Sequence, residues 1–170
     1  MEFLDLAKRR YSVRKFKEDK VSDEIINKIV EAGIVAPTAC NNQPFKITII
    51  KTKEGLDKLK KCTDCHFNAP LAFIISADKD LCWKRSHDGK ISSDVDASIV
   101  TTHMMLEATS LGIGSTWVMW FNPKAVISEY NFPSNLEPIA ILPMGYASDD
   151  AKPASEHNSF RNYEELVEEK

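Results

Sequence analysis

Residues 8–17, KRRYSVRKFK, contain the first side chains that could do chemistry. Arg10, Ser12 and Arg14 alternate, so an extended chain would point all three side chains to one side. Two guanidinium groups and a hydroxyl in this arrangement could bind a phosphate, because guanidinium is a permanently charged, forked donor. The same charges could also form a solvated patch or pair with carboxylates. The motif alone therefore leaves its anionic partner open.

A second candidate is the polar stretch 37–45, PTACNNQPF. Asn41, Asn42 and Gln43 offer amide donors and acceptors. Prolines at positions 37 and 44 would stiffen the loop, which could then present these groups to a polar ring. The alternative is an ordinary helix-to-strand turn, for which Asn and Pro are common residues.

The cysteines offer a third possible chemistry. There are four of them, at Cys40, Cys62, Cys65 and Cys82. This number is too small for a disulfide framework in a chain of 170 residues, so we expect them to be mostly reduced. Cys62 and Cys65, followed by His66, could form half of a zinc site or a redox pair. No second pair with metal-ligand spacing follows, which favours incidental cysteines and no metal site.

Two carboxylates, Asp94 and Asp96, resemble a catalytic pair. They stand at the start of the longest predicted helix, where acidic residues favour the helix dipole and help to cap the first turn. We therefore expect a structural role for both.

Helices and strands must position these candidates. Ile25, Ile26, Ile29 and Val30 recur at helical spacing, whereas the apolar run 71–77 has the length of a buried strand. The predicted helices cover 2–9, 23–34, 54–61, 94–111, 123–129 and a short stretch in 162–169. The predicted strands cover 46–51, 71–77, 115–120 and 138–146. Strands separated by helices indicate a three-layer α+β or α/β domain.

Composition limits the class of protein. A hydrophobic share of 43% in 170 residues predicts one folded domain over residues 1–170. A net charge of −3 argues against general nucleic-acid binding. No apolar run approaches the length of a membrane span, and the N-terminus does not look like a secretory signal. We expect a cytoplasmic protein that binds neither nucleic acid nor membrane.

Taken together, the motifs resemble the FMN-dependent nitroreductase family. The family pattern R-x-S-x-R/K, with an aromatic residue two positions on, is matched by Arg10, Ser12, Arg14 and Phe16. The pattern A-P-S-x-x-N-x-Q-P-W is matched by Ala36, Pro37, Thr38, Asn41, Gln43, Pro44 and Phe45. The stretches 68–78, 94–119 and 142–153, together with Arg161, extend the resemblance over nearly the whole chain. Thr38 stands for the usual Ser, and Phe45 for the usual Trp.

The resemblance implies an α+β fold: a three-layer α/β/α sandwich with a central, mostly antiparallel sheet, in an intertwined homodimer. It implies FMN as cofactor. The phosphate and ribityl end would be held by Arg10, Tyr11, Ser12, Arg14 and Arg161. The partner subunit would contribute Pro37, Thr38, Ala39 and Asn41. The backbone of Met119 and Trp120 would lie near flavin N5, although a glycine is common at the position of Trp120. Lys60 and Lys61 are the nearest candidates for a contact with the flavin pyrimidine, and we assign neither.

The implied activity is that of an NAD(P)H-dependent flavin oxidoreductase. NADH or NADPH would deliver hydride to the flavin, and a nitroaromatic, a quinone or a similar electron-poor acceptor would then be reduced in the same pocket by a ping-pong mechanism. No side chain need act as a nucleophile, so no catalytic residue is expected. The alternatives are a non-catalytic FMN-binding or redox-sensing module that uses Cys62 and Cys65, and a zinc-binding interaction protein.

Overall fold

The computed structural model describes residues 2–170 and is built around an antiparallel sheet of four strands. Their spatial order is β1-β2-β4-β3. The strands are β1 (Phe45–Ile50), β2 (Leu71–Asp78), β3 (Gly114–Ser115) and β4 (Leu136–Gly145). The two central strands, β2 and β4, pair along their length, from Leu71 opposite Met144 to Asp78 opposite Leu136. A mostly antiparallel sheet, as the family resemblance implies, is thereby confirmed.

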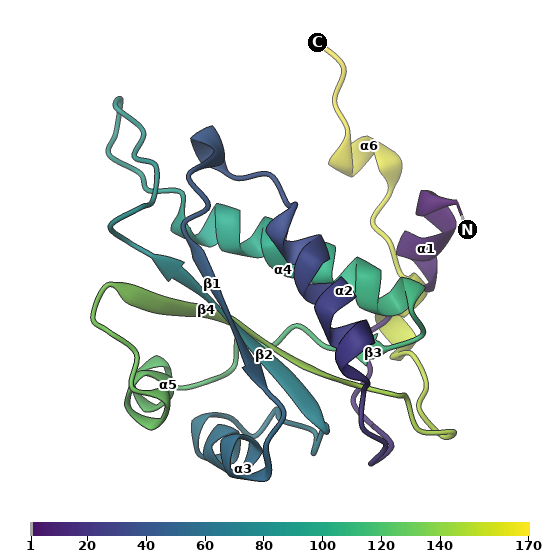
Figure 1. Cartoon of the computed structure of the whole chain (residues 1–170). Coiled ribbons are helices and arrows are strands. Elements are labelled where there is room, and N and C mark those ends of the chain that lie inside the picture. Colours follow the sequence, from purple (N-terminus) through teal and green to yellow (C-terminus); the bar gives the residue numbers. More distant parts are fainter. Residues whose placement is uncertain (1) are drawn as a thin grey trace.

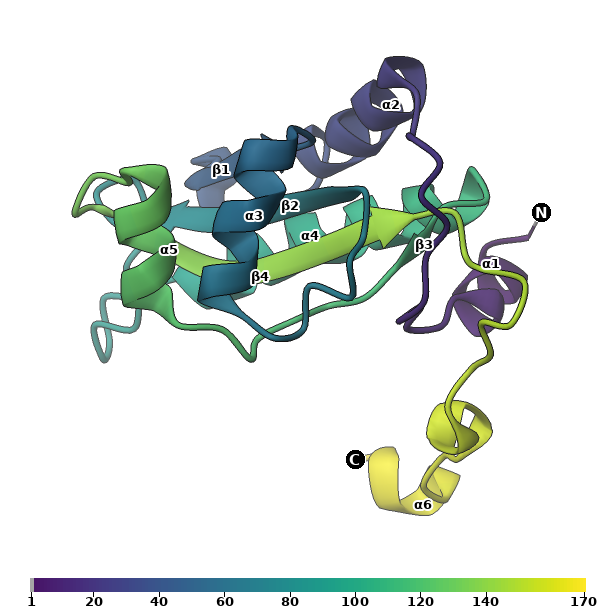
Figure 2. The ribbon, with the colours of Figure 1, turned by 90° about the horizontal axis from the view of Figure 1, so that it is seen from below.

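Helices cover both faces of this sheet, as Figures 1 and 2 show. One face is covered by α2 (Asp23–Ile34) and α4 (Ser93–Ser110), and the other by α3 (Lys53–Cys62) and α5 (Pro123–Tyr130). The remaining helices are α1 (Phe3–Arg9), α6 (Tyr163–Leu166) and the short 3-10 turns η1 (Ala39–Asn41) and η2 (Ser155–Asn158). The three-layer α/β/α sandwich is therefore confirmed.

The apolar patterns in the sequence explain these layers. Every residue of β2 except Asp78 is buried, because helices pack on both of its faces. In α2 the inward side is formed by Ile26, Ile29 and Gly33. A Cβ atom at Gly33 would lie 2.9 Å from Met104 Cγ of α4, so this glycine allows the two helices to approach closely. Packed closely against each other, α2 and α4 thus cover one of the two apolar faces of the sheet.

The predicted strand over 115–120 is largely wrong. Only Gly114 and Ser115 form a strand, and Val118 then makes an isolated bridge to Ile141. The ladder is interrupted opposite Pro143, which accepts the Thr116 N–H over 3.3 Å but has no N–H to donate in return. The segment beyond Val118 leaves the sheet and runs toward α5, as Figure 1 shows.

The C-terminal segment stands apart from these layers. Figure 2 shows it leaving the body of the molecule next to α1. Within residues 152–170, His157 alone is not exposed, and it packs edge-on against Tyr11 with 6.2 Å between ring centroids. Phe160 and Tyr163 are 79% and 67% exposed. The segment therefore presents large apolar side chains that the rest of the chain does not cover. None of the helices in residues 2–170 is long and apolar enough to cross a membrane.

Candidate functional site

The basic segment after α1 is held against β3. Ser12 forms a parallel bridge with Ser115, and the Val13 N–H donates to the Ser115 carbonyl over 3.0 Å. The Thr116 hydroxyl donates to the Val13 carbonyl. A Cβ atom at Gly114 would lie 2.7 Å from Val13 Cγ2, so glycine is needed for this approach. The backbone of the basic segment is thus fixed from Ser12 onward.

Two lysines of the same segment are neutralised by carboxylates. Lys15 Nζ lies 2.5 Å from an oxygen of Asp150, and Lys17 Nζ lies 2.7 Å from an oxygen of Asp149. The hydrogen bond from Lys17 to Asp149 also raises the pKa of this lysine. Surface pairs of this kind contribute little stability. They do, however, place a carboxylate beside each of these two lysines, so that each positive charge already has a negative partner.

Arg10 and Arg14, the two arginines predicted to bind phosphate, differ from these lysines. In residues 2–170, neither Arg10 nor Arg14 forms an ion pair with a carboxylate. Arg14 donates to the Ser12 carbonyl over 3.3 Å, and its side chain is otherwise available. Val13, between Ser12 and Arg14, is buried, as expected for an extended chain whose alternate residues face opposite sides. The structure therefore keeps two guanidinium groups available near one extended segment.

Arg161 is not joined to Arg10 and Arg14 within residues 2–170. Its guanidinium pairs with Glu165 over 3.0 Å, and no hydrogen bond or ion pair within residues 2–170 connects it to Arg10 or Arg14. Tyr11, by contrast, lies with Arg10 along a pocket of about 130 Å³ that also contacts Gly112, just after the C-terminal end of α4. The role predicted for Arg161 stays a prediction.

The polar loop at 37–43 has an unusual backbone. Cys40, Asn41 and Gln43 have φ angles of 52°, 54° and 51°, in the left-handed region that non-glycine residues rarely occupy. The Thr38 hydroxyl accepts the Gln43 N–H over 3.0 Å and closes the loop. The side chain of Asn41 is exposed. The loop is thus held in a costly conformation while its polar side chains stay accessible.

A buried carboxylate secures this loop. Asp96 is 1% exposed, and its Oδ1 accepts the Ala39 N–H over 2.9 Å. Its Oδ2 accepts the Ser92 hydroxyl over 2.6 Å. Asp96 therefore has a structural role, as expected, but its side chain reaches across to the loop and does not cap the backbone N–H groups of its own helix. The sequence showed the carboxylate but not its partner, because a hydrogen bond to a distant N–H leaves no local pattern.

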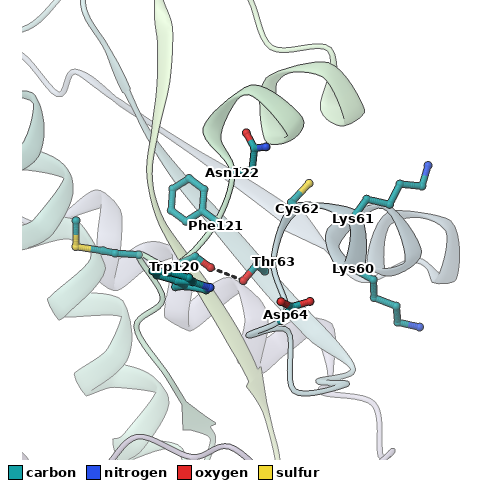
Figure 3. Close-up of a pocket in the computed structure, with 9 residues that line it drawn as sticks. Lys60, Lys61, Cys62, Thr63, Asp64, Trp120, Phe121 and Asn122 are labelled. Atoms are coloured by element: carbon teal, nitrogen blue, oxygen red, sulfur yellow. Dashed lines mark hydrogen bonds between the residues drawn. The ribbon is translucent and has the colours of Figure 1, made fainter.

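The segment after β3 lines the second part of the site. A pocket of about 380 Å³ lies between the end of α3 and the start of α5, and Figure 3 shows the side chains that line it. It is lined by Lys60, Lys61, Cys62, Thr63, Asp64, Met119, Trp120, Phe121 and Asn122. The ammonium groups of Lys60 and Lys61 pair with Asp57 and Glu129 over 2.9 and 3.0 Å. In Figure 3 both lysine side chains point away from Trp120.

Hydrogen bonds fix the backbone at this pocket. The Phe121 N–H donates to the Met119 carbonyl over 3.0 Å and forms a tight turn. The Asn122 N–H donates to the Cys62 carbonyl over 2.8 Å. The N–H groups of Met119 and Trp120 have no partner within residues 2–170, and both residues are more than 70% exposed. Two residues that line the pocket therefore have unpartnered backbone donors.

The first cysteine of the pair, Cys62, is packed in the interior of the protein. Cys62 is buried, donates to the Lys58 carbonyl, and has a pKa raised mainly by burial, so its thiol stays protonated. Burial and the nearby Lys60 lower the pKa of His66. Within residues 2–170, no three His, Cys, Asp or Glu side chains are grouped so that they could hold a metal ion. Cys62 therefore has the environment of a packed thiol and not that of a thiolate nucleophile.

Two groups of candidate residues lie at opposite ends of α4. The loop 37–43 is bonded to Asp96 near the start of the helix, and the basic segment lies at Gly112, just beyond its end. The helix has 18 residues, which is about 27 Å at 1.5 Å per residue. A single chain therefore does not bring these two groups to one ligand of ordinary size.

Comparison with known proteins gives consistent results. The family model described as "Nitroreductase family" matches residues 7–67 and 62–146. The solved structure of a nitroreductase family protein from Clostridium difficile 630 is 44% identical, with a TM-score of 0.93, and the match covers 99% of this chain and 98% of that one. A second solved structure, an FMN-dependent nitroreductase from Clostridium difficile R20291, is 29% identical, with a TM-score of 0.75, over 94% of this chain and 98% of that one. A putative NADH dehydrogenase/NAD(P)H nitroreductase from Archaeoglobus fulgidus is 30% identical over 88% of this chain and 87% of its own length.

Proposed function

This chain belongs to the nitroreductase family, and from that premise we propose that it is an NAD(P)H-dependent flavin oxidoreductase that binds FMN. We further propose that it passes electrons from NADH or NADPH to nitroaromatic, quinone or similar acceptors. The observation that supports this best is that two arginines without ion pairs and two backbone N–H groups without partners lie on two chain segments that are bonded to each other at Val13 and Ser115.

The residues present fit the phosphate end of FMN. A phosphate needs charged donors that are not already neutralised, and Arg10 and Arg14 meet this condition whereas Lys15 and Lys17 do not. The Ser12 side chain stands between the two arginines and has no hydrogen bond within residues 2–170. Ser12 would add a neutral donor to the phosphate or the ribityl chain.

The fit to the ring end rests on the turn at Met119 and Trp120. Their free N–H groups are suited to acceptor atoms on the edge of an isoalloxazine ring. The bond between Val13 and Ser115 joins the phosphate segment to the chain that leads to this turn. We propose that the flavin spans from the arginines to Trp120.

The separation along α4 supports a site made by two subunits. Pro37, Thr38, Ala39 and Asn41 lie at the far end of the helix from Arg10 in one subunit, so they would reach a flavin held by a partner. The exposed apolar residues of the C-terminal segment, such as Phe160 and Tyr163, would be covered by the same partner. We therefore propose a homodimer with two sites, to which Arg161 contributes from its projecting segment.

The proposed reaction needs little chemistry from side chains. Bound FMN supplies two-electron redox chemistry, and the protein supplies binding, orientation and electrostatics. NAD(P)H, one proton and a quinone give NAD(P)⁺ and a hydroquinone; hydride carries both electrons and one proton, and water supplies the other proton. Donor and acceptor would use the same face of the bound flavin, so they would alternate in ping-pong fashion.

The visible spectrum of the purified protein tests the proposal. We expect a yellow protein, or one that becomes yellow when FMN is added, and bleaching of the flavin bands after anaerobic addition of NADH or NADPH. A protein that cannot be loaded with FMN would disprove it. A flavin that binds but is not bleached by either nucleotide would favour a non-catalytic FMN-binding module instead. Sedimentation velocity tests the homodimer, and cell fractionation tests the predicted cytoplasmic location.

A further inference from the structure

Thr63 is the first residue after α3, and its side chain forms part of the pocket wall in Figure 3. It is 6% exposed. Its hydroxyl donates to the Trp120 carbonyl over 2.5 Å and accepts the Cys65 N–H over 3.0 Å. Because the hydroxyl acts as donor and acceptor at once, its orientation is fixed.

This hydroxyl is the side-chain support of the turn at Trp120. The bond joins residues 57 positions apart in the sequence. The bond between the Phe121 N–H and the Met119 carbonyl closes the turn internally, and the Asn122 N–H anchors the following residue to Cys62. Within residues 2–170, only Thr63 contacts the carbonyl of Trp120 by a hydrogen bond.

From these contacts we infer that Thr63 is a positioning residue for the flavin: it fixes the Trp120 peptide so that the neighbouring N–H groups stay available to the cofactor. This inference rests on the proposed function. Thr63 need not contact FMN itself. Its role is to remove freedom from a short turn whose residues, Met119 and Trp120, are otherwise exposed.

The effect should depend on the redox state of the flavin. In the oxidised ring N5 carries a lone pair that can accept an N–H, whereas in the two-electron-reduced ring the same atom carries a proton. A well-placed N–H therefore stabilises the oxidised form more than the reduced form. Loosening the turn should weaken binding of oxidised FMN and raise the midpoint potential.

The test compares Thr63→Val, which removes the hydroxyl at nearly constant volume, with Thr63→Ser, which retains it. Tyr130→Phe is the matched control, because the Tyr130 hydroxyl also donates to a backbone carbonyl, that of Gly55, in the layer formed by α3 and α5. Dissociation constants are measured by titrating each FMN-free protein with FMN and following flavin fluorescence. Midpoint potentials are measured by anaerobic dye titration of the loaded proteins.

For Thr63→Val we expect FMN binding to weaken about tenfold, the loss typical of one hydrogen bond. A tenfold difference between the two redox states corresponds to a rise of about 30 mV in the two-electron potential. Thr63→Ser and Tyr130→Phe should both behave like the wild type. If Thr63→Val folds poorly by circular dichroism, Thr63→Ala provides the same comparison.

Three outcomes would overturn the inference. An unchanged FMN affinity and potential in Thr63→Val would remove any role for Thr63 at the flavin. Equal losses in Thr63→Val and Tyr130→Phe would show that the α3–α5 layer, and not the turn, is responsible. Failure of the wild type itself to bind FMN would disprove the proposed function together with this inference. This outcome is separate from the first two, because it is seen in the wild type and the first two are seen only in the variants.

Discussion

The Asp96 carboxylate and the backbone N–H of Ala39, which are 57 residues apart in the sequence, form a hydrogen bond of 2.9 Å. This bond joins a helix of the core to the loop at 37–43. The loop contains three non-glycine residues at positive φ, a conformation that costs free energy unless the surroundings hold it. The buried Asp96 carboxylate helps to hold the loop through this hydrogen bond.

Replacing Asp96 by Ala should therefore destabilise the protein and loosen the loop. The substitution leaves the Ala39 N–H and the Ser92 hydroxyl without their acceptor, which should lower the free energy of unfolding by about 2–4 kcal/mol. Urea unfolding measures this loss, and limited proteolysis reports cleavage within 37–43. Asp94→Ala is the control, because Asp94 is exposed and should cost less than about 1 kcal/mol. Equal costs for the two variants would contradict the assigned role of Asp96.

Replacing Arg10 and Arg14 together by Ala should abolish tight FMN binding. Each charge-assisted hydrogen bond to phosphate contributes about 1.5–3 kcal/mol, so the pair should weaken binding at least about a hundredfold. Ultrafiltration followed by absorbance measures the FMN that remains bound. The double variant of Lys15 and Lys17 is matched in charge and should retain FMN, because those lysines are already paired with Asp150 and Asp149. Equal loss in both double variants would show a diffuse electrostatic effect.

Replacing Gly114 by Ala should displace the basic segment. The new Cβ would lie 2.7 Å from Val13 Cγ2, and relief of that overlap should cost about 1–3 kcal/mol. Because Val13 sits between Ser12 and Arg14, FMN affinity should fall as well. Gly112→Ala is the comparison: it strains a φ of 76° but meets no atom within 4 Å. It should lower stability by about 1 kcal/mol while FMN is retained. Loss of FMN in the Gly112 variant alone would refute this explanation.

The thiols should react in an order set by burial. Cys40 is exposed, whereas Cys62 is buried and its pKa is raised above the ordinary value of 9.0 by desolvation. Below pH 9 the thiol of Cys62 is neutral in both the folded and the unfolded protein. Above that pH the unfolded thiol ionises first, so this group's contribution to stability is lost as the pH rises through the folded pKa. Labelling with a disulfide reagent at pH 8 should modify Cys40 quickly and Cys62 only after urea is added. Rapid labelling of Cys62 in the folded protein would contradict this.

The sequence was sufficient for the features that depend on local pattern. The predicted helix at 23–34 agrees with α2 at both ends, because its apolar spacing, the Ser22 cap and the acidic first turn all act within a few residues. The buried strand β2 was equally clear from its apolar run. The alternation of Arg10, Ser12 and Arg14 has this meaning only in an extended chain, and the structure supplies one, with a bridge at Ser12 and a buried Val13.

The remaining features depend on partners that are distant in the sequence. The strand predicted after Ser115 stops because its neighbour across the sheet is Pro143, and strand pairing could not be read from either segment alone. The roles of Thr63 and Asp96 depend on bonds to Trp120 and Ala39. A threonine next to a cysteine carries no signal of such a bond. Long-range hydrogen bonds therefore mark the limit of the sequence-based prediction.

The separation of the loop 37–43 from the arginines, along the length of α4, predicts how two defective alleles behave together. If the loop at one end serves the partner's flavin and the arginines at the other end serve the subunit's own, then a chain with a defective loop and a chain with defective arginines are each inactive as homodimers. Mixed in one cell, they would form heterodimers in which one site receives an intact loop and intact arginines, while the other receives neither. Two inactive alleles should thus complement each other and restore about half the activity in each mixed dimer.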